Sequence, residues 1–366
     1  MRRRLLTTTG ALAAAAALLA PTAPALAKGP ELGAEYLGQA TFPTSTTFGG
    51  TQVGGLSSIT YDAERGVYYT ISDDPNNARY YTVRVDVGDG RLSDGDVSFT
   101  GVTRLQAPGG GPYAPTAIDP EGLALTPDRD LIVTSEGYSN SLVDPFVRRY
   151  SLDGTYKSDF EVPDAFRPNA DHTRGVRQNL AFESAGIPKD GNFLFTGTEN
   201  ALVQDGPAAT LTDQSPSRIM RYNLHTGRLD RQWVYVTDRV KEPSSIFSVN
   251  GLVELLPINN EYLISMERSA SIGAPGTGNS IKLYKVALPG ATDVNGADSI
   301  ADVGRVRPAE KTLLFDLDKL GIPLDNVEGL TFGPRLPDGR QSLVLVSDNN
   351  FAASQFTQFL LFALDK

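Results

Sequence analysis

The hydrophobic residues of this chain fall in short runs that do not follow a helical period. The runs span about four to eight residues, are rich in Val, Ile, Tyr, Phe and Leu, and are bounded by Gly, Pro, Asp and Asn, as β-strands are. A helical pattern is nearly absent, and the stretch 315–320 is the clearest candidate for a short helix. The pattern therefore predicts an all-β protein.

A short signature opens a strand-like run at five places along the chain. It consists of a polar or small residue, a small residue and a leucine, and each copy is followed by a second run that ends on an acid and then by a third run. Internal repeats of this kind are typical of a β-propeller built from four-stranded antiparallel blades. The signature begins at Gly54, Glu121, Gln178, Asn250 and Glu328.

The last repeat ends the chain at its third strand, so its fourth strand has to come from elsewhere. Residues 35–42 have strand character, and a strand supplied by the N-terminal part closes the ring and removes exposed sheet edges. We count five blades, and a sixth, poorly matching blade stays open in the long segments 237–249 and 290–310. Because cutting a ring of blades would expose sheet edges, residues 28–366 are expected to form one propeller domain.

The first 27 residues are predicted to be a signal peptide. Arginines at 2–4 precede an apolar, alanine-rich stretch at 5–20, and Ala-Leu-Ala at 25–27 is a small-residue cleavage site. The apolar stretch is short and is followed by prolines, which argues against a membrane anchor. We expect export by the Sec or the twin-arginine route and a secreted product that is not attached to a membrane.

The composition excludes several classes of function. The chain has no cysteine and two histidines, which excludes a thiol nucleophile or a zinc–thiolate site and leaves little for a multi-histidine metal site. A formal net charge of −10 argues against nucleic acid as a partner, because binding to the phosphate backbone needs a basic surface. The expected product is an acidic monomer without disulfides.

The acids that end the second run of each repeat are the first candidates for chemistry. In a propeller, the first strand of each blade lines the central channel and the second strand runs antiparallel to it. The start of the first strand and the end of the second therefore lie at the same end of the channel. An acid occurs at the end of the second strand in all five repeats, which predicts a ring of ligands for a cation. The predicted ligands are Asp73, Glu136, Glu199, Glu267 and Asp348.

Two repeats also carry a glutamate at the start of the first strand, Glu121 and Glu328, and we predict that these are the catalytic residues. Seven carboxylates at one channel mouth repel one another unless they bind a hard cation, pair with arginine or hold protons. Oxygen ligands of this kind favour Ca²⁺, and Arg174, Arg177 and Arg268 are the expected substrate-binding residues. The alternative is that the acids only cap backbone N–H groups at strand ends.

Several strings of the sequence resemble a known family, the phytase-like family, which is described as "esterase-like activity of phytase". The strings lie at 55–59, 119–123, 174–179, 326–330 and 347–351 and read GLSSI, DPEGL, RGVRQN, NVEGL and SDNNF. The resemblance covers nearly the whole mature chain and implies a secreted β-propeller that hydrolyses phosphoric or other esters. It assigns no catalytic residue. The calcium-dependent propeller phytases have six blades, whereas we count five.

These observations favour a secreted, calcium-assisted hydrolase that acts on a small-molecule phosphoric ester. The first alternative is a non-catalytic propeller that binds a small molecule, a peptide or a cell-wall component. The second alternative is a carboxylic esterase, which ranks lowest because no serine has an identifiable base partner in the sequence.

Overall fold

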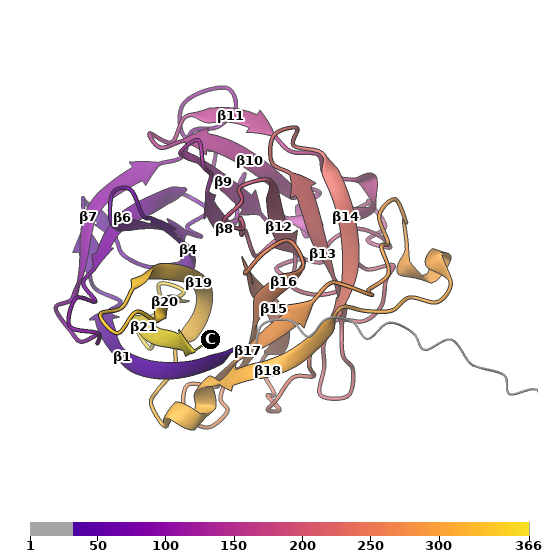
Figure 1. Cartoon of the computed structure of the whole chain (residues 1–366). Helices are drawn as coiled ribbons and strands as arrows, with labels where there is room; N and C mark the ends of the chain where they lie inside the picture. Colours follow the sequence, from indigo (N-terminus) through magenta and orange to yellow (C-terminus); the bar gives the residue numbers. More distant parts are fainter. Residues whose placement is uncertain (1–31, 366) are drawn as a thin grey trace, which may run out of the picture.

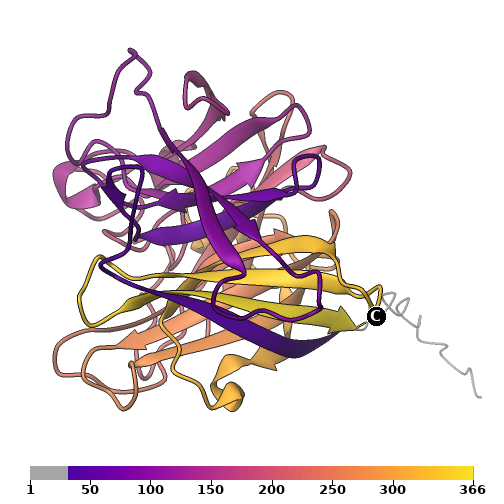
Figure 2. The same ribbon diagram turned by 90° about the vertical axis from the view of Figure 1, so that its left-hand side faces the viewer.

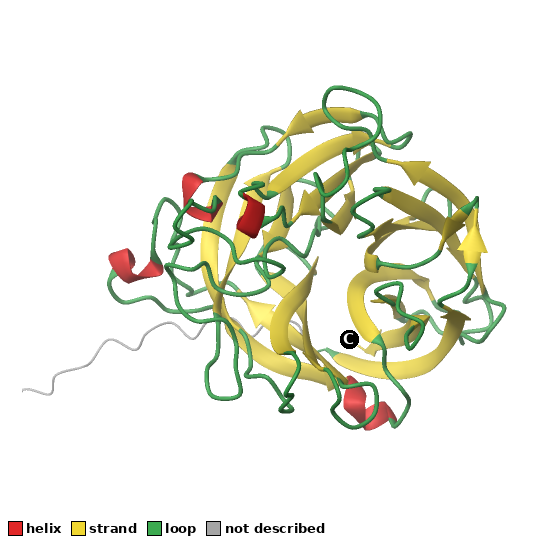
Figure 3. Ribbon diagram, turned by 180° about the vertical axis from the view of Figure 1, so that it is seen from behind, coloured by secondary structure: helices red, strands yellow, loops and turns green. Residues whose placement is uncertain are grey.

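The computed structural model describes residues 32–365, so the predicted signal peptide lies outside the described residues. Strands make up nearly all of the regular structure, and the helices are single 3-10 turns between them (Figure 3). The expected helical stretch 315–320 contains one of these turns. The four turns are η1 (Ser139–Ser141), η2 (Asp164–Phe166), η3 (Ile300–Val303) and η4 (Leu317–Leu320).

Five antiparallel sheets surround a central axis as the blades of a propeller (Figure 1). The all-β class and the count of five blades are therefore confirmed. In the first three blades the strands are β4 (Leu56–Asp62), β5 (Val67–Ser72), β6 (Arg79–Val85) and β7 (Val97–Arg104); β8 (Pro120–Leu125), β9 (Asp130–Ser135), β10 (Phe146–Ser151) and β11 (Tyr156–Asp159); and β12 (Phe193–Gly197), β13 (Pro216–Asn223) and β14 (Leu229–Val236).

The fourth blade is formed by consecutive strands, and the fifth is completed from the N-terminal part of the described chain. The strands are β15 (Ser248–Pro257), β16 (Tyr262–Ser271), β17 (Asn279–Ala287) and β18 (Glu310–Asp316), and then β19 (Asn326–Arg335), β20 (Gln341–Asp348), β21 (Phe356–Asp365) and β1 (Gly33–Pro43). A small hairpin, β2 (Thr47–Phe48) with β3 (Thr51–Gln52), follows β1.

Strand β1 closes the ring as predicted. It pairs antiparallel with β21, from Gly33 opposite Asp365 to Pro43 opposite Phe356. Figure 2 shows this indigo strand beside the yellow C-terminal strands. The segments left open for a sixth blade contain no complete sheet among the described residues, since 290–310 holds only η3 and the first residue of β18.

The third blade departs from the repeat, because its innermost segment is irregular. The expected strand beginning at Gln178 is absent from the described chain, since Asn179 adopts a left-handed conformation with φ of 56° and the chain turns there. Residues 182 and 186 make two isolated bridges to the strand region 195–198 instead. The inner edge of this blade is therefore a loop that two bridges hold against the neighbouring strand.

The hydrophobic core consists of five layers, one between each pair of neighbouring blades. Leu123 and Tyr69, for example, pack between the first and second blades, and Leu330 and Val253 pack between the fourth and fifth. The remaining three layers join the second and third, the third and fourth, and the fifth and first blades. Burial of each apolar face between two neighbours holds the ring together. No helix among residues 32–365 is long and apolar enough to cross a membrane.

Candidate functional site

The inner strands of the blades carry a β-bulge beside the end of the second strand. In the fifth blade, Val327 pairs with Ser347 and Gly329 pairs with Val346, so Glu328 stands opposite no residue. A bulge of this kind changes the direction of a side chain and often occurs next to active sites. The same register recurs in three other blades, where the bulges contain Ser57, Glu121 and Val253.

The irregular third blade supplies an equivalent residue through a single bridge. Phe182 bridges Thr198, which is the pairing that the residue before Glu121 makes in the second blade. Glu183 therefore occupies the position in the third blade that Glu121 occupies in the second. The repeat signature placed Gln178 at this position, five residues too early.

Another set of equivalent positions lies on the second strand, one residue beyond the residue that pairs just before the bulge. In the fourth blade, Leu252 pairs with Glu267 in the way that Val327 pairs with Ser347 in the fifth. The fourth member of the set is therefore Arg268, and the prediction that Glu267 belongs to it is off by one residue. The other four predicted members hold their places: Asp73, Glu136, Glu199 and Asp348.

Glu267 is bound within the polar structure at the interface of the third and fourth blades. Its carboxylate accepts hydrogen bonds from Tyr235 Oη at 2.6 Å, from the Asp238 backbone N–H at 2.8 Å and from Asn250 Nδ2 at 3.0 Å. It also forms an ion pair with Lys311. These partners account for the burial of Glu267 and give it a structural role away from the other predicted ligands.

A cavity of about 720 Å³ opens beside the channel mouth. Besides Asp325, seven carboxylates from the inner strands and second-strand ends of four blades line the cavity, and Glu136 lies within 4.8 Å of four of them. Glu136 and six of the seven side chains are buried, and Asp73 is partly buried with its Oδ1 atom shielded from solvent. We call them the acidic cluster: Asp73, Asp119, Glu121, Glu136, Glu183, Glu199, Glu328 and Asp348.

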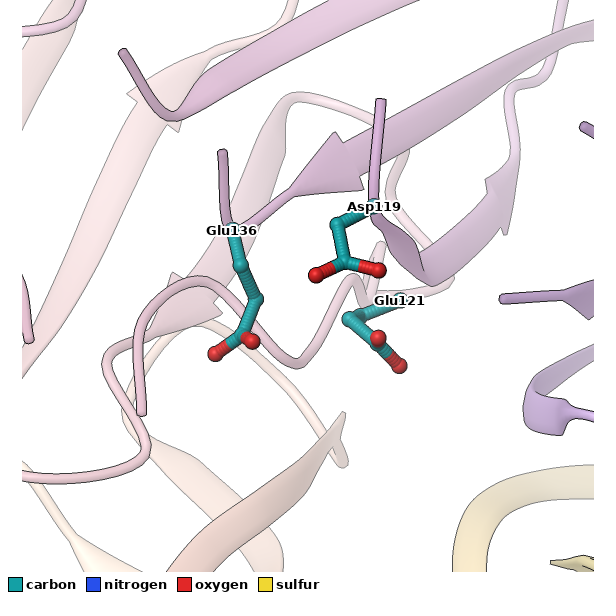
Figure 4. Close-up of side chains that lie close together, drawn as sticks. All are labelled: Asp119, Glu121 and Glu136. Carbon is teal, nitrogen blue, oxygen red and sulfur yellow. The ribbon is translucent and has the colours of Figure 1, made fainter. Parts of the chain in front are cut away.

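Two groups of three acids lie close enough to share an ion. One oxygen each of Asp119, Glu121 and Glu136 lie within 4.8 Å of one another, and the same holds for Glu136, Glu183 and Glu199. Figure 4 shows the first three side chains gathered at one place. Glu136 belongs to both groups, so the two sets of oxygens are adjacent.

Glycines of the repeat signature leave the space that the acids fill. A β-carbon on Gly55 would lie 1.8 Å from Asp73 Oδ1, and one on Gly251 would lie 2.2 Å from Glu199 Cγ. Real β-carbons do not approach other atoms this closely. The glycines are therefore required by the two carboxylates, which explains the small residue in these two copies of the signature.

Arg268 is the cation inside the acidic cluster. Its Nη2 atom lies 2.8 Å from Glu328 Oε1 and 3.6 Å from Glu199 Oε1, and all three side chains are nearly buried. Asn326 Nδ2 also donates to Glu328 at 2.9 Å and to Asp348 at 3.3 Å. Arg268 and Asn326 therefore hold Glu328 in place and offset part of the negative charge.

Burial and mutual repulsion raise the pKa values of these acids. Burial, together with the charge of Glu328, raises the pKa of Asp73 to about 7, and burial with the charge of Asp119 raises the pKa of Glu136 to about 8. Burial raises the pKa of Glu199 to about 7 although Arg268 opposes the shift. The pKa values of Glu121, Glu183, Glu328 and Asp348 are raised as well, and burial raises that of Asp119 to about 6.

The cluster also contains buried polar atoms that lack a hydrogen-bond partner in the protein. Among the described residues, Asp73 Oδ1, Glu199 Oε1 and Arg268 Nε are buried and make no hydrogen bond. An orphaned buried carboxylate oxygen is costly unless an ion or a ligand satisfies it. Carboxylate and carboxamide oxygens are the donors that Ca²⁺ prefers, so the residues present fit a hard divalent cation.

Two of the three predicted substrate-binding arginines lie elsewhere. Arg174 donates to the Asp164 carbonyl at 2.7 Å, and Arg177 donates to the Ala201 and Gly206 carbonyls at 3.0 and 2.6 Å. Neither side chain lines the cavity. Both arginines therefore hold loops of the third blade, and Arg268 is the member of the predicted set that reaches the site.

Two members of the acidic cluster were missed by sequence reasoning. Asp119 lies two residues before Glu121, as Asn326 lies two residues before Glu328, so a polar residue at this spacing in both copies was an available signal. Glu183 gave a weaker signal, because alanine stands where the signature has leucine.

The family model described as "Phytase-like: Esterase-like activity of phytase" matches residues 51–351 of this chain. The matched segment covers most of the chain, with every strand of the first four blades and strands β19 and β20 of the fifth. The chain therefore belongs to the phytase-like family. No curated protein matches the sequence.

Solved structures that resemble the chain are themselves distant in sequence. An endo-arabinase from Bacteroides thetaiotaomicron has a TM-score of 0.46 at 12% identity, covering 89% of this chain and 97% of its own. An endo-1,4-β-xylanase from the same organism has a TM-score of 0.44 at 9% identity, with 84% and 90% covered. A structure described as a putative glycoside hydrolase from Bacteroides ovatus has a TM-score of 0.42 at 12% identity, with 84% and 86% covered.

Proposed function

We propose that this member of the phytase-like family is a cation-assisted hydrolase of phosphoric esters, with Ca²⁺ as the expected cation. One observation carries the proposal: eight carboxylates, seven of them buried, converge beside a cavity, and two of their oxygens accept no hydrogen bond from the described residues. A protein of net charge −10 repels a phosphate ester unless a cation lies between them. The acidic cluster is where such a cation is expected to bind.

The two groups of three acids are the expected ligands. Asp119, Glu121 and Glu136 would hold one ion, and Glu136, Glu183 and Glu199 form the adjacent set of oxygens. A bound divalent cation polarises a phosphoryl oxygen and lowers the pKa of a bound water. The side chains then have to orient the ester and take up a proton.

Glu121 and Glu328 are suited to different tasks in this proposal. Glu328 is held by Arg268 and Asn326, so it positions the guanidinium, whose unpartnered Nε is available for an oxygen of the substrate. Glu121 lies in the first group of three acids, so its task in this proposal is to bind the cation, and its side chain also borders the cavity where the ester would react. Secretion, a monomeric state and a small-molecule substrate stay predictions from the sequence.

Hydrolysis of p-nitrophenyl phosphate by the mature protein, with calcium and then with a chelator, tests the proposal. We expect calcium-dependent release that Glu121→Gln lowers by about a hundredfold, whereas Glu310→Gln, on the exposed edge strand β18, retains it. Calcium that raises the melting temperature without any turnover would instead support a non-catalytic binding propeller. Turnover that persists fully in chelator would contradict the role of the cation.

A further inference from the structure

One wall of the cavity is apolar and leads from the acidic cluster to the outer rim. On strands β15 and β16, Gly251 pairs with Arg268 and Val249 pairs with Ala270. Side chains two residues apart on a strand lie on the same face, and Val249, Ala270 and Arg268 all line the cavity. Along this face, the Arg268 guanidinium at the floor of the cavity is therefore followed by the apolar side chains of Val249 and Ala270.

The same face continues past the regular ladder. The Ile272 backbone N–H donates to the Phe247 carbonyl at 3.0 Å, which extends the pairing by one step, and both side chains line the cavity. Ser244 Oγ fixes this rim, because it donates to the Ile272 carbonyl at 2.6 Å and accepts from the Phe247 backbone N–H at 3.1 Å. We call Phe247, Val249, Ala270 and Ile272 the apolar wall.

The two outer residues of the apolar wall, Phe247 and Ile272, are large hydrophobic side chains that are exposed to solvent. Phe247 is 50% exposed and Ile272 is 53% exposed. Six large hydrophobic residues are exposed in the described part of the chain, and three of them lie on this rim: Ile246, Phe247 and Ile272. The fifth blade lines the cavity with polar side chains that include Asn326, Asn350 and Gln355. The cavity therefore offers charge at its floor and a continuous apolar surface on the β15 and β16 side.

We propose that the cavity takes a phosphoric ester of an apolar alcohol, with the phosphate at the acidic cluster and the aryl or alkyl group against the apolar wall. The proposal rests on the proposed function for the position of the phosphate. The substrate is the expected occupant because the apolar wall and the acidic cluster line one continuous cavity, and Arg268 joins them on the strand pair β15 and β16. A uniformly polar polyphosphate would leave the apolar wall unused.

Equilibrium binding of 1-naphthyl phosphate and of glycerol phosphate, measured by calorimetry in the presence of calcium, tests this assignment. We expect the mature protein to bind the naphthyl ester more tightly, by roughly tenfold or more, because the ring buries apolar surface that glycerol lacks. The double substitution Phe247→Ser with Ile272→Ser should lower this ratio by roughly tenfold. The control Ile246→Ser should leave it unchanged, because Ile246 is 73% exposed and does not line the cavity.

The outcomes separate the two proposals. Equal affinity for both esters, or a ratio that the double substitution leaves unaltered, would overturn the apolar wall as a substrate surface, even if the esters are hydrolysed. A preference for the naphthyl ester that is lost in the double variant, without turnover of any ester, would support the apolar wall and overturn the hydrolase. Failure to bind either ester would overturn both.

Discussion

Replacement of Glu254 by alanine should destabilise the whole ring. Glu254 follows the bulge of the fourth blade, at the position that small residues occupy in the other four blades: Ser58, Gly122, Ser184 and Gly329. The inner strands nearly touch there, since a β-carbon on Gly122 would lie 2.5 Å from the carbonyl carbon of Ser184, and one on Gly329 would lie 3.0 Å from Ser58 Cα. Glu254 is therefore the long side chain among five equivalent positions around the axis.

The Glu254 carboxylate links four of the five blades. It accepts hydrogen bonds from Ser58 Oγ at 2.6 Å and from the Leu255 backbone N–H at 3.0 Å, and from the backbone N–H groups of Ala185 and Leu330. The side chain is 1% exposed, so water does not readily take the place of the lost carboxylate as a hydrogen-bond acceptor. Four buried donors left without an acceptor, at about 1 kcal/mol each, give a loss of about 4 kcal/mol in the free energy of unfolding for Glu254→Ala.

Urea unfolding followed by fluorescence measures this loss directly. The signal comes from Trp233, the single tryptophan of the chain, which is buried in the third blade. Glu254→Gln keeps one acceptor oxygen and should lose about half as much, roughly 2 kcal/mol, and Glu310→Ala on the exposed edge strand should change little. A Glu254→Ala protein within about 1 kcal/mol of the wild type would refute the role of Glu254 as the link at the axis.

Three further outcomes follow from the acidic cluster. Because burial and neighbouring charges raise the folded-state pKa of Glu136 to about 8 and burial raises that of Glu199 to about 7, the folded state holds protons that the unfolded state has lost. The melting temperature in chelator should therefore fall as pH rises from about 5 to 8, and calcium should restore it; a rise over this range would contradict the shifts. Arg268→Met should cost about 3–5 kcal/mol in chelator, measured by urea unfolding, because Glu199 and Glu328 lose their buried cation; an unchanged stability would exclude that pairing. Gly251→Val should weaken calcium binding in a calorimetric titration at least tenfold by displacing Glu199, and wild-type affinity would show that Glu199 is not a ligand.

The sequence was sufficient to predict the architecture, because the propeller depends on features that the pattern displays. Short apolar runs between turn residues indicate strands, and their recurrence indicates blades. The strand character of residues 35–42 predicted the closure that β1 and β21 make. The five hydrophobic layers explain why the prediction succeeded, since each blade needs two apolar faces.

The register within each blade was harder to predict, and the site depends on it. The signature matched the structure in the second and fifth blades, where glutamate, glycine and leucine coincide with the bulge. In the fourth blade it placed Glu267 where the structure has Arg268, and in the third it missed Glu183. Register is set by hydrogen bonds to the second strand, and a bulge shifts it by one residue without changing the apolar pattern. For the same reason, the sequence pattern did not identify Glu254 as the residue that links the blades at the axis.

Titration of the metal-free protein, residues 28–366, with calcium chloride at pH 7, in two buffers of different ionisation enthalpy, tests the central claim most directly. The account predicts binding with release of protons, because Asp73, Glu136 and Glu199 have pKa values of about 7, 8 and 7 and give up protons to a bound cation. Glu183→Gln should weaken this binding at least tenfold, whereas Glu310→Gln should not. Absence of binding, or binding that Glu183→Gln leaves unchanged, would contradict the assignment of the acidic cluster as a cation site.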